Sequence, residues 1–163
     1  MSQSVPPTGN PFADNADNAG APAPYAPPPV NDSLGLGLAA AFVAALVAAA
    51  VYGGIAGAME REIGWAAVGV GFLTGFAAGK VGGPNPVLPV VSALLSLAAV
   101  YVGQLFEIAI IIAKSQSLTA TEILFRHTGE LNTLWKEGSG VMTFLFFALA
   151  AFAAFSGARK AAA

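Results

Sequence analysis

The run of residues 34–58 reads LGLGLAAAFVAALVAAAVYGGIAGA and holds 25 residues without a charged side chain. At 1.5 Å per residue it makes a helix of roughly 37 Å, which is long enough to cross the hydrocarbon core of a bilayer. Asn31, Asp32 and Ser33 come directly before it and offer N-cap side chains. The run therefore predicts a first membrane-spanning helix over residues 34–58.

The composition of the whole chain agrees with a lipid environment. Only 10% of the 163 residues are charged and 56% are hydrophobic, whereas a soluble domain has about a quarter charged residues. The chain has no cysteine and one histidine, too few for a structural zinc site with about four such ligands. The net charge is −2 and the bases are scattered, which argues against nucleic-acid binding. We therefore expect no metal, no cofactor and no nucleic-acid partner.

Three more apolar runs predict three more membrane-spanning helices, at residues 63–81, 87–113 and 140–158. A Gly-Gly-Pro-Asn-Pro sequence at residues 82–86 separates the second from the third, since glycine and proline in series end helices. The third run is longer than a bilayer needs, so it is expected to tilt or protrude. The prediction is an all-α, polytopic membrane protein with a four-helix transmembrane domain over residues 34–160.

Two polar segments accompany these spans. Residues 1–33 are rich in Pro, Ala, Asn and Asp and lack Lys and Arg, which predicts a disordered tail. Residues 115–139 place leucines and a tryptophan at roughly helical intervals, and Thr119 and Glu122 have the spacing of a capping box. We expect two short amphipathic helices at the membrane interface, with a break at Gly129, against the alternative of an ordinary loop.

Small residues recur every four positions along the second span, at Ala67, Gly71, Gly75 and Gly79. Four residues advance about 400° around a helix, so these positions form one stripe that another helix backbone can approach closely. Gly53 and Gly57 form a similar pair at the end of the first span. Two interpretations remain open: the stripe packs against the first span, or it is a surface for self-association or for another protein.

The third span holds an acidic residue, Glu107, inside its apolar run, and Gln104 lies three residues earlier on the same helix face. An unpaired carboxylate is costly in a membrane, so Glu107 is expected to be paired, protonated or near water. Arg61 and Lys114 are predicted on the same side of the membrane, where either could pair with it. The carboxylate is then a structural ion pair or part of a proton or ion path.

Four spans place both termini on one side of the membrane. That side carries three basic residues, Lys80, Arg159 and Lys160, and the other side carries four. The positive-inside rule therefore does not decide the orientation. We expect the termini in the cytoplasm, because Arg159 and Lys160 directly follow the last span with no acid beside them.

Around the start of the second span the chain reads Glu62-Ile63-Gly64-Trp65-Ala66-Ala67-Val68-Gly69-Val70-Gly71. This stretch resembles one that recurs in uncharacterised small bacterial membrane proteins with a variable N-terminal extension. The Pro/Ala-rich tail resembles those of actinobacterial proteins. The resemblance covers residues 34–114 and implies a four-helix protein of the bacterial plasma membrane. It carries no activity and no functional residues.

The sequence favours a non-enzymatic protein. It has no Ser–His–acid set, no paired intramembrane Asp and no His-x-x-x-His spacing. The main hypothesis is a packing, assembly or interaction role in the lipid bilayer, with a second copy or another membrane protein as partner. The alternative is a small oligomeric transporter or channel that uses Glu107 and Gln104.

Overall fold

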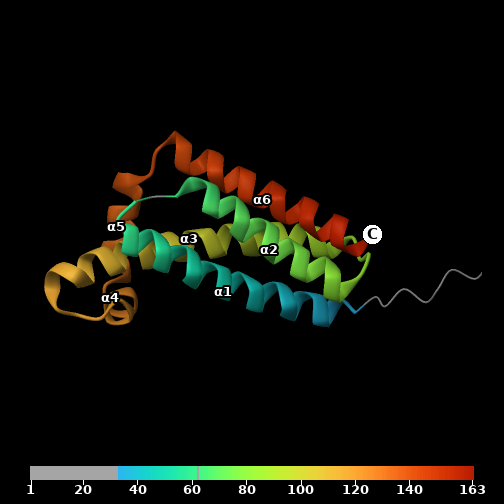
Figure 1. Cartoon of the computed structure of the whole chain (residues 1–163), viewed down its shortest axis with the longest axis horizontal. Coiled ribbons are helices and arrows are strands. Elements are labelled where there is room, and N and C mark those ends of the chain that lie inside the picture. Colours follow the sequence, from blue (N-terminus) through green and yellow to red (C-terminus); the bar gives the residue numbers. More distant parts are fainter. Residues whose placement is uncertain (1–32, 62) are drawn as a thin grey trace, which may run out of the picture.

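The computed structural model describes residues 33–61 and 63–163, and in them it contains six α-helices and no strand (Figure 1). The helices are α1 (Leu34–Met59), α2 (Gly64–Gly82), α3 (Val87–Gln116), α4 (Ala120–Arg126), α5 (Thr128–Gly138) and α6 (Val141–Ala162). Four of them, α1, α2, α3 and α6, are long and apolar enough to cross a membrane. The predicted all-α fold with four spans is confirmed, while the predicted tail lies outside the described residues except for Ser33.

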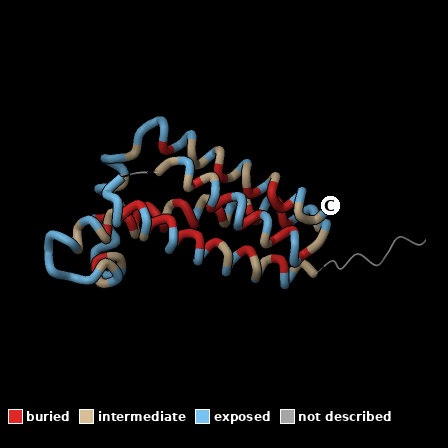
Figure 2. The backbone as a smooth tube through the Cα atoms, viewed as in Figure 1, coloured by how far each residue is buried: buried red, intermediate tan, exposed pale blue. Residues whose placement is uncertain are grey.

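The four long helices form two parallel pairs, α1 with α3 and α2 with α6 (Figure 1). Consecutive spans run in opposite directions, and α4 and α5 turn the chain back between α3 and α6. As a result α6 runs parallel to α2 and lies beside it. The buried positions lie on the inward faces of the four long helices, and the outward faces are exposed to the surrounding lipid (Figure 2).

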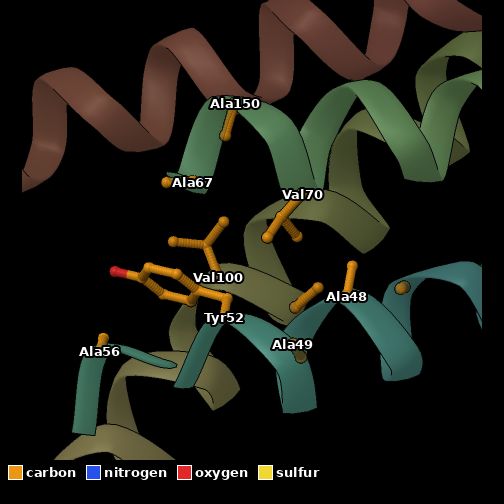
Figure 3. Packing of buried hydrophobic residues seen from close by; sticks show 10 residues of the cluster. Ala48, Ala49, Tyr52, Ala56, Ala67, Val70, Val100 and Ala150 are labelled. Atoms are coloured by element: carbon orange, nitrogen blue, oxygen red, sulfur yellow. The ribbon is translucent and has the colours of Figure 1, made fainter. Parts of the chain in front are cut away.

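Alanine dominates the core where the four long helices meet. Tyr52 is 4% exposed and points into a space walled by alanines of α1, by Val70 of α2, by Val100 of α3 and by Ala150 of α6 (Figure 3). Small side chains let the helix backbones come close, which supplies the van der Waals contact that holds helices together in lipid. The single large ring of Tyr52 fills the space that the alanines leave.

The start of α1 is tied to the end of α2. Ser33 occupies the N-cap position of α1, but its side chain makes no capping hydrogen bond, and its hydroxyl donates to the carbonyl oxygen of Val81 at 3.2 Å. Asn31 and Asp32, the other two predicted capping residues, lie outside the described residues. Just inside this end, Gly37 and Gly82 lie so close that a Cβ on Gly37 would stand 2.7 Å from the Cα of Gly82. The antiparallel pair α1–α2 is therefore closed at the end of the bundle that carries the C-terminus.

The short helices α4 and α5 fold back onto the second half of α3. Ile123 and Leu131 are buried against Leu105 and Ala109 of α3. One half of the predicted capping box is confirmed, because the Thr119 hydroxyl accepts from the N–H of Glu122 at 3.3 Å, while the Glu122 carboxylate pairs with Arg126. The predicted break at Gly129 is wrong. His127 ends α4 and precedes α5, and Gly129 lies in the first turn of α5.

Candidate functional site

The glycine stripe of α2 is buried inside the bundle, where it packs against α6. A Cβ added at Gly71, Gly75 or Gly79 would collide with the carbonyl oxygen of Ala150, Ala154 or Ala158, respectively. Both helices repeat a small residue every four positions and run parallel, so each glycine meets the alanine of the same turn. Ala67, the fourth member of the stripe, is 1% exposed. The stripe thus packs within the chain, but its partner is α6 and not the first span.

Gly53 and Gly57 of α1 lie against α3 rather than against the stripe. A Cβ on Gly53 would collide with the carbonyl oxygen of Gly103, and one on Gly57 would stand 2.8 Å from the Cβ of Ile110. Gly103 in turn makes room for the ring of Tyr52, whose Cδ1 would stand 2.6 Å from a Cβ at that position. Each parallel pair of helices therefore has its own small-residue contact.

Gln104 and Glu107 line a cavity of about 380 Å³ between α3, α5 and α6. Both side chains are buried, at 6% and 8% exposed. They project from one face of α3, as their spacing of three residues predicts. The remaining wall is formed by isoleucines of α3, by the end of α5, and by Ser139 and Thr143 before and within α6. The cavity is apolar over most of its wall, with an amide and a carboxylate at one side.

Trp135 of α5 closes this cavity and joins three helices. Its indole N–H donates to the Oε1 of Gln104 at 2.7 Å. Its ring meets Tyr101 of α3 edge-on at 5.0 Å between centroids and lies 6.1 Å from the ring of Phe147 on α6. The Tyr101 hydroxyl donates to the Oδ1 of Asn132, one turn earlier on α5. These contacts fix α5 against the bundle through polar groups that need partners in a low-dielectric setting.

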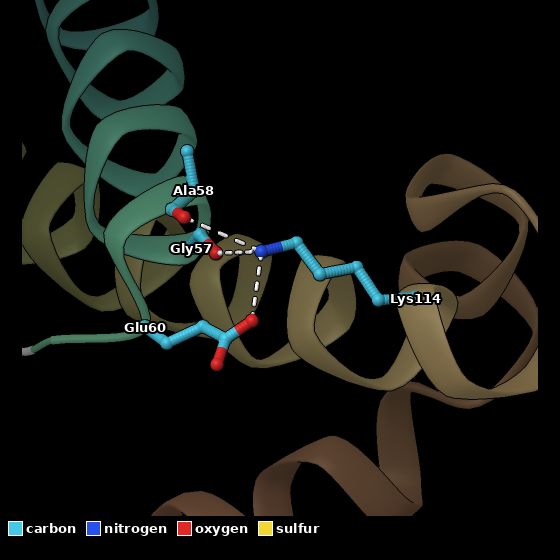
Figure 4. Close-up of polar contacts among 4 residues, drawn as sticks. All are labelled: Gly57, Ala58, Glu60 and Lys114. Carbon is cyan, nitrogen blue, oxygen red and sulfur yellow. Dashed lines mark hydrogen bonds and ion pairs between the residues drawn. The ribbon is translucent and has the colours of Figure 1, made fainter.

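Lys114 and Arg61, the predicted basic partners of Glu107, lie elsewhere. The Lys114 ammonium donates to the Oε1 of Glu60 at 2.9 Å and to the carbonyl oxygens of Gly57 and Ala58 at 3.1 and 3.3 Å (Figure 4). It thus caps the C-terminal end of α1, where a positive charge is favoured by the helix dipole. Arg61 is exposed in the turn between α1 and α2. The four predicted polar residues therefore do not form one site. Gln104 and Glu107 line the cavity, Lys114 caps α1, and Arg61 is exposed.

The cavity offers polar contacts for a small ligand rather than a metal cage. In the described part of the chain no three His, Cys, Asp or Glu side chains gather closely enough to hold a metal ion. His127 lies outside the cavity, with its Nδ1 3.4 Å from the Oε2 of Glu130 on an exposed segment. A carboxylate and an amide in an apolar wall suit a small polar or amphipathic solute.

Sequence reasoning missed two parts of these sites. It did not pick out the alanine repeat Ala150, Ala154 and Ala158, although the interval of four residues is visible in the sequence. It also did not connect the tryptophan of the polar segment with the third span, where Trp135 donates to Gln104. Comparisons of the chain with protein-family models, with curated proteins and with solved structures give no match.

Proposed function

We propose that this chain is a non-enzymatic membrane protein with a packing or assembly role, and that it receives another membrane-spanning helix in an open groove between α1 and α2. The groove has a volume of about 460 Å³ and lies on the outside of the bundle. Its lining includes small residues, Ala44, Ala48, Ala66, Gly69 and Ala77, and the buried Tyr52 and Val70. The lining also includes large apolar residues that are about half exposed, Val47, Val51, Ile55, Leu73 and Phe76.

The small residues in the lining of the groove are the observation that carries this proposal. Membrane helices associate where small residues allow close backbone contact, and within this bundle α2 and α6 associate in that way. The glycine stripe is already covered by α6 and is not free for a partner. At Gly69, in contrast, a Cβ would meet no atom within 4 Å. The groove is therefore the surface that would accept a helix without disturbing the bundle.

Cysteine cross-linking in native membranes tests the proposal, because the chain has no cysteine of its own. Val51→Cys and Leu73→Cys place a thiol in the groove, and Leu94→Cys and Phe152→Cys place one on exposed outward positions of α3 and α6. We expect cross-linked products from the two groove variants and not from the two controls. Equal cross-linking at all four positions, or a lone monomer after mild extraction with no product at any position, would contradict the proposal.

Filling the groove gives a second test. Gly69→Leu adds a large side chain to the groove at a position where a Cβ would meet no atom of the bundle within 4 Å. Ala148→Leu adds the same bulk on an exposed position of α6. We expect Gly69→Leu to abolish the groove cross-link formed by Leu73→Cys, and Ala148→Leu to leave it unchanged. If the Leu73→Cys cross-link still forms in the presence of Gly69→Leu, the groove is not the contact surface.

The cavity at Gln104 and Glu107 supports a second candidate, a small oligomeric transporter or channel. Four spans seldom enclose a pore alone, so this function would require several copies. The variant to test is Glu107→Gln, measured as proton and cation flux in proteoliposomes. Lost flux with unchanged stability supports transport, whereas wild-type protein without any flux counts against it.

The proposal includes the bacterial plasma membrane, with both termini in the cytoplasm. The orientation is supported by the pairing of charges. On the side of the α4–α5 segment Lys114 and Arg126 pair with Glu60 and Glu122. Reporter fusions at the C-terminus and near residue 128 test the orientation. Activity of a periplasm-specific reporter at the C-terminus would reverse it.

A further inference from the structure

A second cavity, of about 450 Å³, lies at the end of the bundle that holds the C-terminus. The turn between α2 and α3 forms one wall, and the last two turns of α6 form the other. Its lining includes Gly83, Asn85, Pro86, Phe155, Arg159 and Ala162. Because α2, α3 and α6 are membrane spans that end or begin here, this cavity lies at the level of the lipid headgroups.

Arg159 supplies the cationic group of this cavity. Its guanidinium carbon lies 5.8 Å from the centroid of the Phe155 ring, one turn earlier on α6, which orients the guanidinium by a cation–π contact. The side chain is exposed, so a ligand can reach it. A guanidinium presents a planar set of N–H donors that matches two oxygens of a phosphate.

The charged side chains that the structure describes at this end of the bundle are all basic. In the described residues at this end, residues 33–37, 78–89 and 155–163, the charged side chains are Lys80, Arg159 and Lys160, and no Asp or Glu occurs among them. The opposite end is different, because Arg126 there pairs with Glu122 at 3.2 Å. Cations without a nearby acid at a membrane surface attract anionic headgroups.

We infer that this cavity binds the phosphate of an acidic phospholipid headgroup, held by the guanidinium of Arg159. The lining residues Phe155 and Ala162 form an apolar wall for the glycerol and the first part of an acyl chain. A phospholipid is the ligand that joins a phosphate to an apolar chain at this depth of the membrane. The inference is independent of the groove between α1 and α2.

Native mass spectrometry of the full chain, released from nanodiscs, tests the site. The nanodiscs contain phosphatidylglycerol and phosphatidylcholine in equal amounts. We expect wild-type protein to retain phosphatidylglycerol in preference. Arg159→Gln should lower that retention about five- to tenfold, while Arg126→Gln, the same change on an exposed base at the other end, should leave it unchanged. Unaltered elution in mild detergent shows that both variants are folded.

Three outcomes would overturn the inference. The first is equal retention of the two lipids by wild-type protein. The second is an equal loss with Arg159→Gln and Arg126→Gln, which would indicate a general effect of net charge. The third is complete displacement of phosphatidylglycerol by millimolar inorganic phosphate, because the site would then take a free anion and not a lipid.

Discussion

The contact between α2 and α6 and the contact between α3 and α5 are built in opposite ways. The first is a backbone contact, in which Gly71, Gly75 and Gly79 leave no room for even a methyl group against α6. The second is made by large side chains, in which Trp135 bridges to Gln104 and a cavity of about 380 Å³ remains. The first contact leaves no space, whereas the second leaves a mostly apolar cavity with two polar side chains, Gln104 and Glu107, in its wall.

The difference shows how a protein in lipid can combine close helix packing with an internal cavity. Hydrophobicity does not hold helices together when the solvent is itself apolar, so close packing must do so. Close packing leaves no space for a cavity. The two features lie at different parts of the same helix: α6 packs closely along its second half, and the cavity forms beside its first turn, where Thr143 lines it together with residues of α3 and α5.

The largest effect is expected from breaking the closed contact with Gly75→Leu. Its Cβ would collide with the backbone of Ala154, which cannot move without shifting α6. We expect a loss of about 3 kcal/mol or more in the free energy of unfolding, or an unfolded protein. Thermal unfolding in mild detergent, followed by circular dichroism, measures it. Gly69→Leu on the same helix is the matched control and should unfold like wild type, because its Cβ meets no atom within 4 Å. Equal unfolding of the two variants would contradict the closed contact.

A smaller effect is expected from the open contact, with Gln104→Leu and Trp135→Phe. Each removes one partner of the 2.7 Å hydrogen bond between α3 and α5. The double variant should lose less stability than the sum of the two single losses, by a coupling energy of about 0.5 to 2 kcal/mol. Unfolding of all four proteins in one detergent gives this value. Strict additivity would show that the hydrogen bond contributes nothing to stability.

Lys114→Ala should have a weaker effect than either, about 1 kcal/mol or less. The ammonium caps α1 through two carbonyl oxygens and Glu60, but both side chains of the ion pair are partly exposed, at 45% and 62%. Glu60→Gln should cost less than Lys114→Ala, since the carbonyl contacts remain. High salt should reduce the difference between Lys114→Ala and wild type. An effect that grows with salt would be the contrary result.

The smallest effect is expected for Gly69→Ala. This position is helical and open, so alanine removes the conformational freedom of glycine without a collision. We expect unchanged stability or a gain of up to about 1 kcal/mol. Gly71→Ala, half a turn away in the closed contact, should instead destabilise the protein. A gain in stability for both variants would mean that α6 can move enough to accommodate a methyl group.

The sequence was sufficient for the four spans because each is a long run without charge, and length and hydropathy act over one helix at a time. It was not sufficient to predict which helices pack against each other. The alanine repeat of α6 is hidden among further alanines, so no face of that helix stands out by composition. The cap formed by Lys114 depends on the left-handed backbone of Glu60, with φ at 52°, which turns the chain beneath the end of α1.

Gln104 and Glu107 were predicted on one face of α3, and the structure places them together in the cavity. Their neighbour Trp135 could not be predicted, because its position depends on how α4 and α5 fold back along α3. That arrangement is a tertiary property, set by the burial of Ile123 and Leu131 and not by any interval in the sequence.

The parallel contact between α2 and α6 also has a consequence for biogenesis. The spans α1, α2 and α3 precede α6 along the chain, so the glycine face of α2 stays uncovered until α6 has been made and inserted. A chain interrupted before Val141 would keep three spans with this face uncovered.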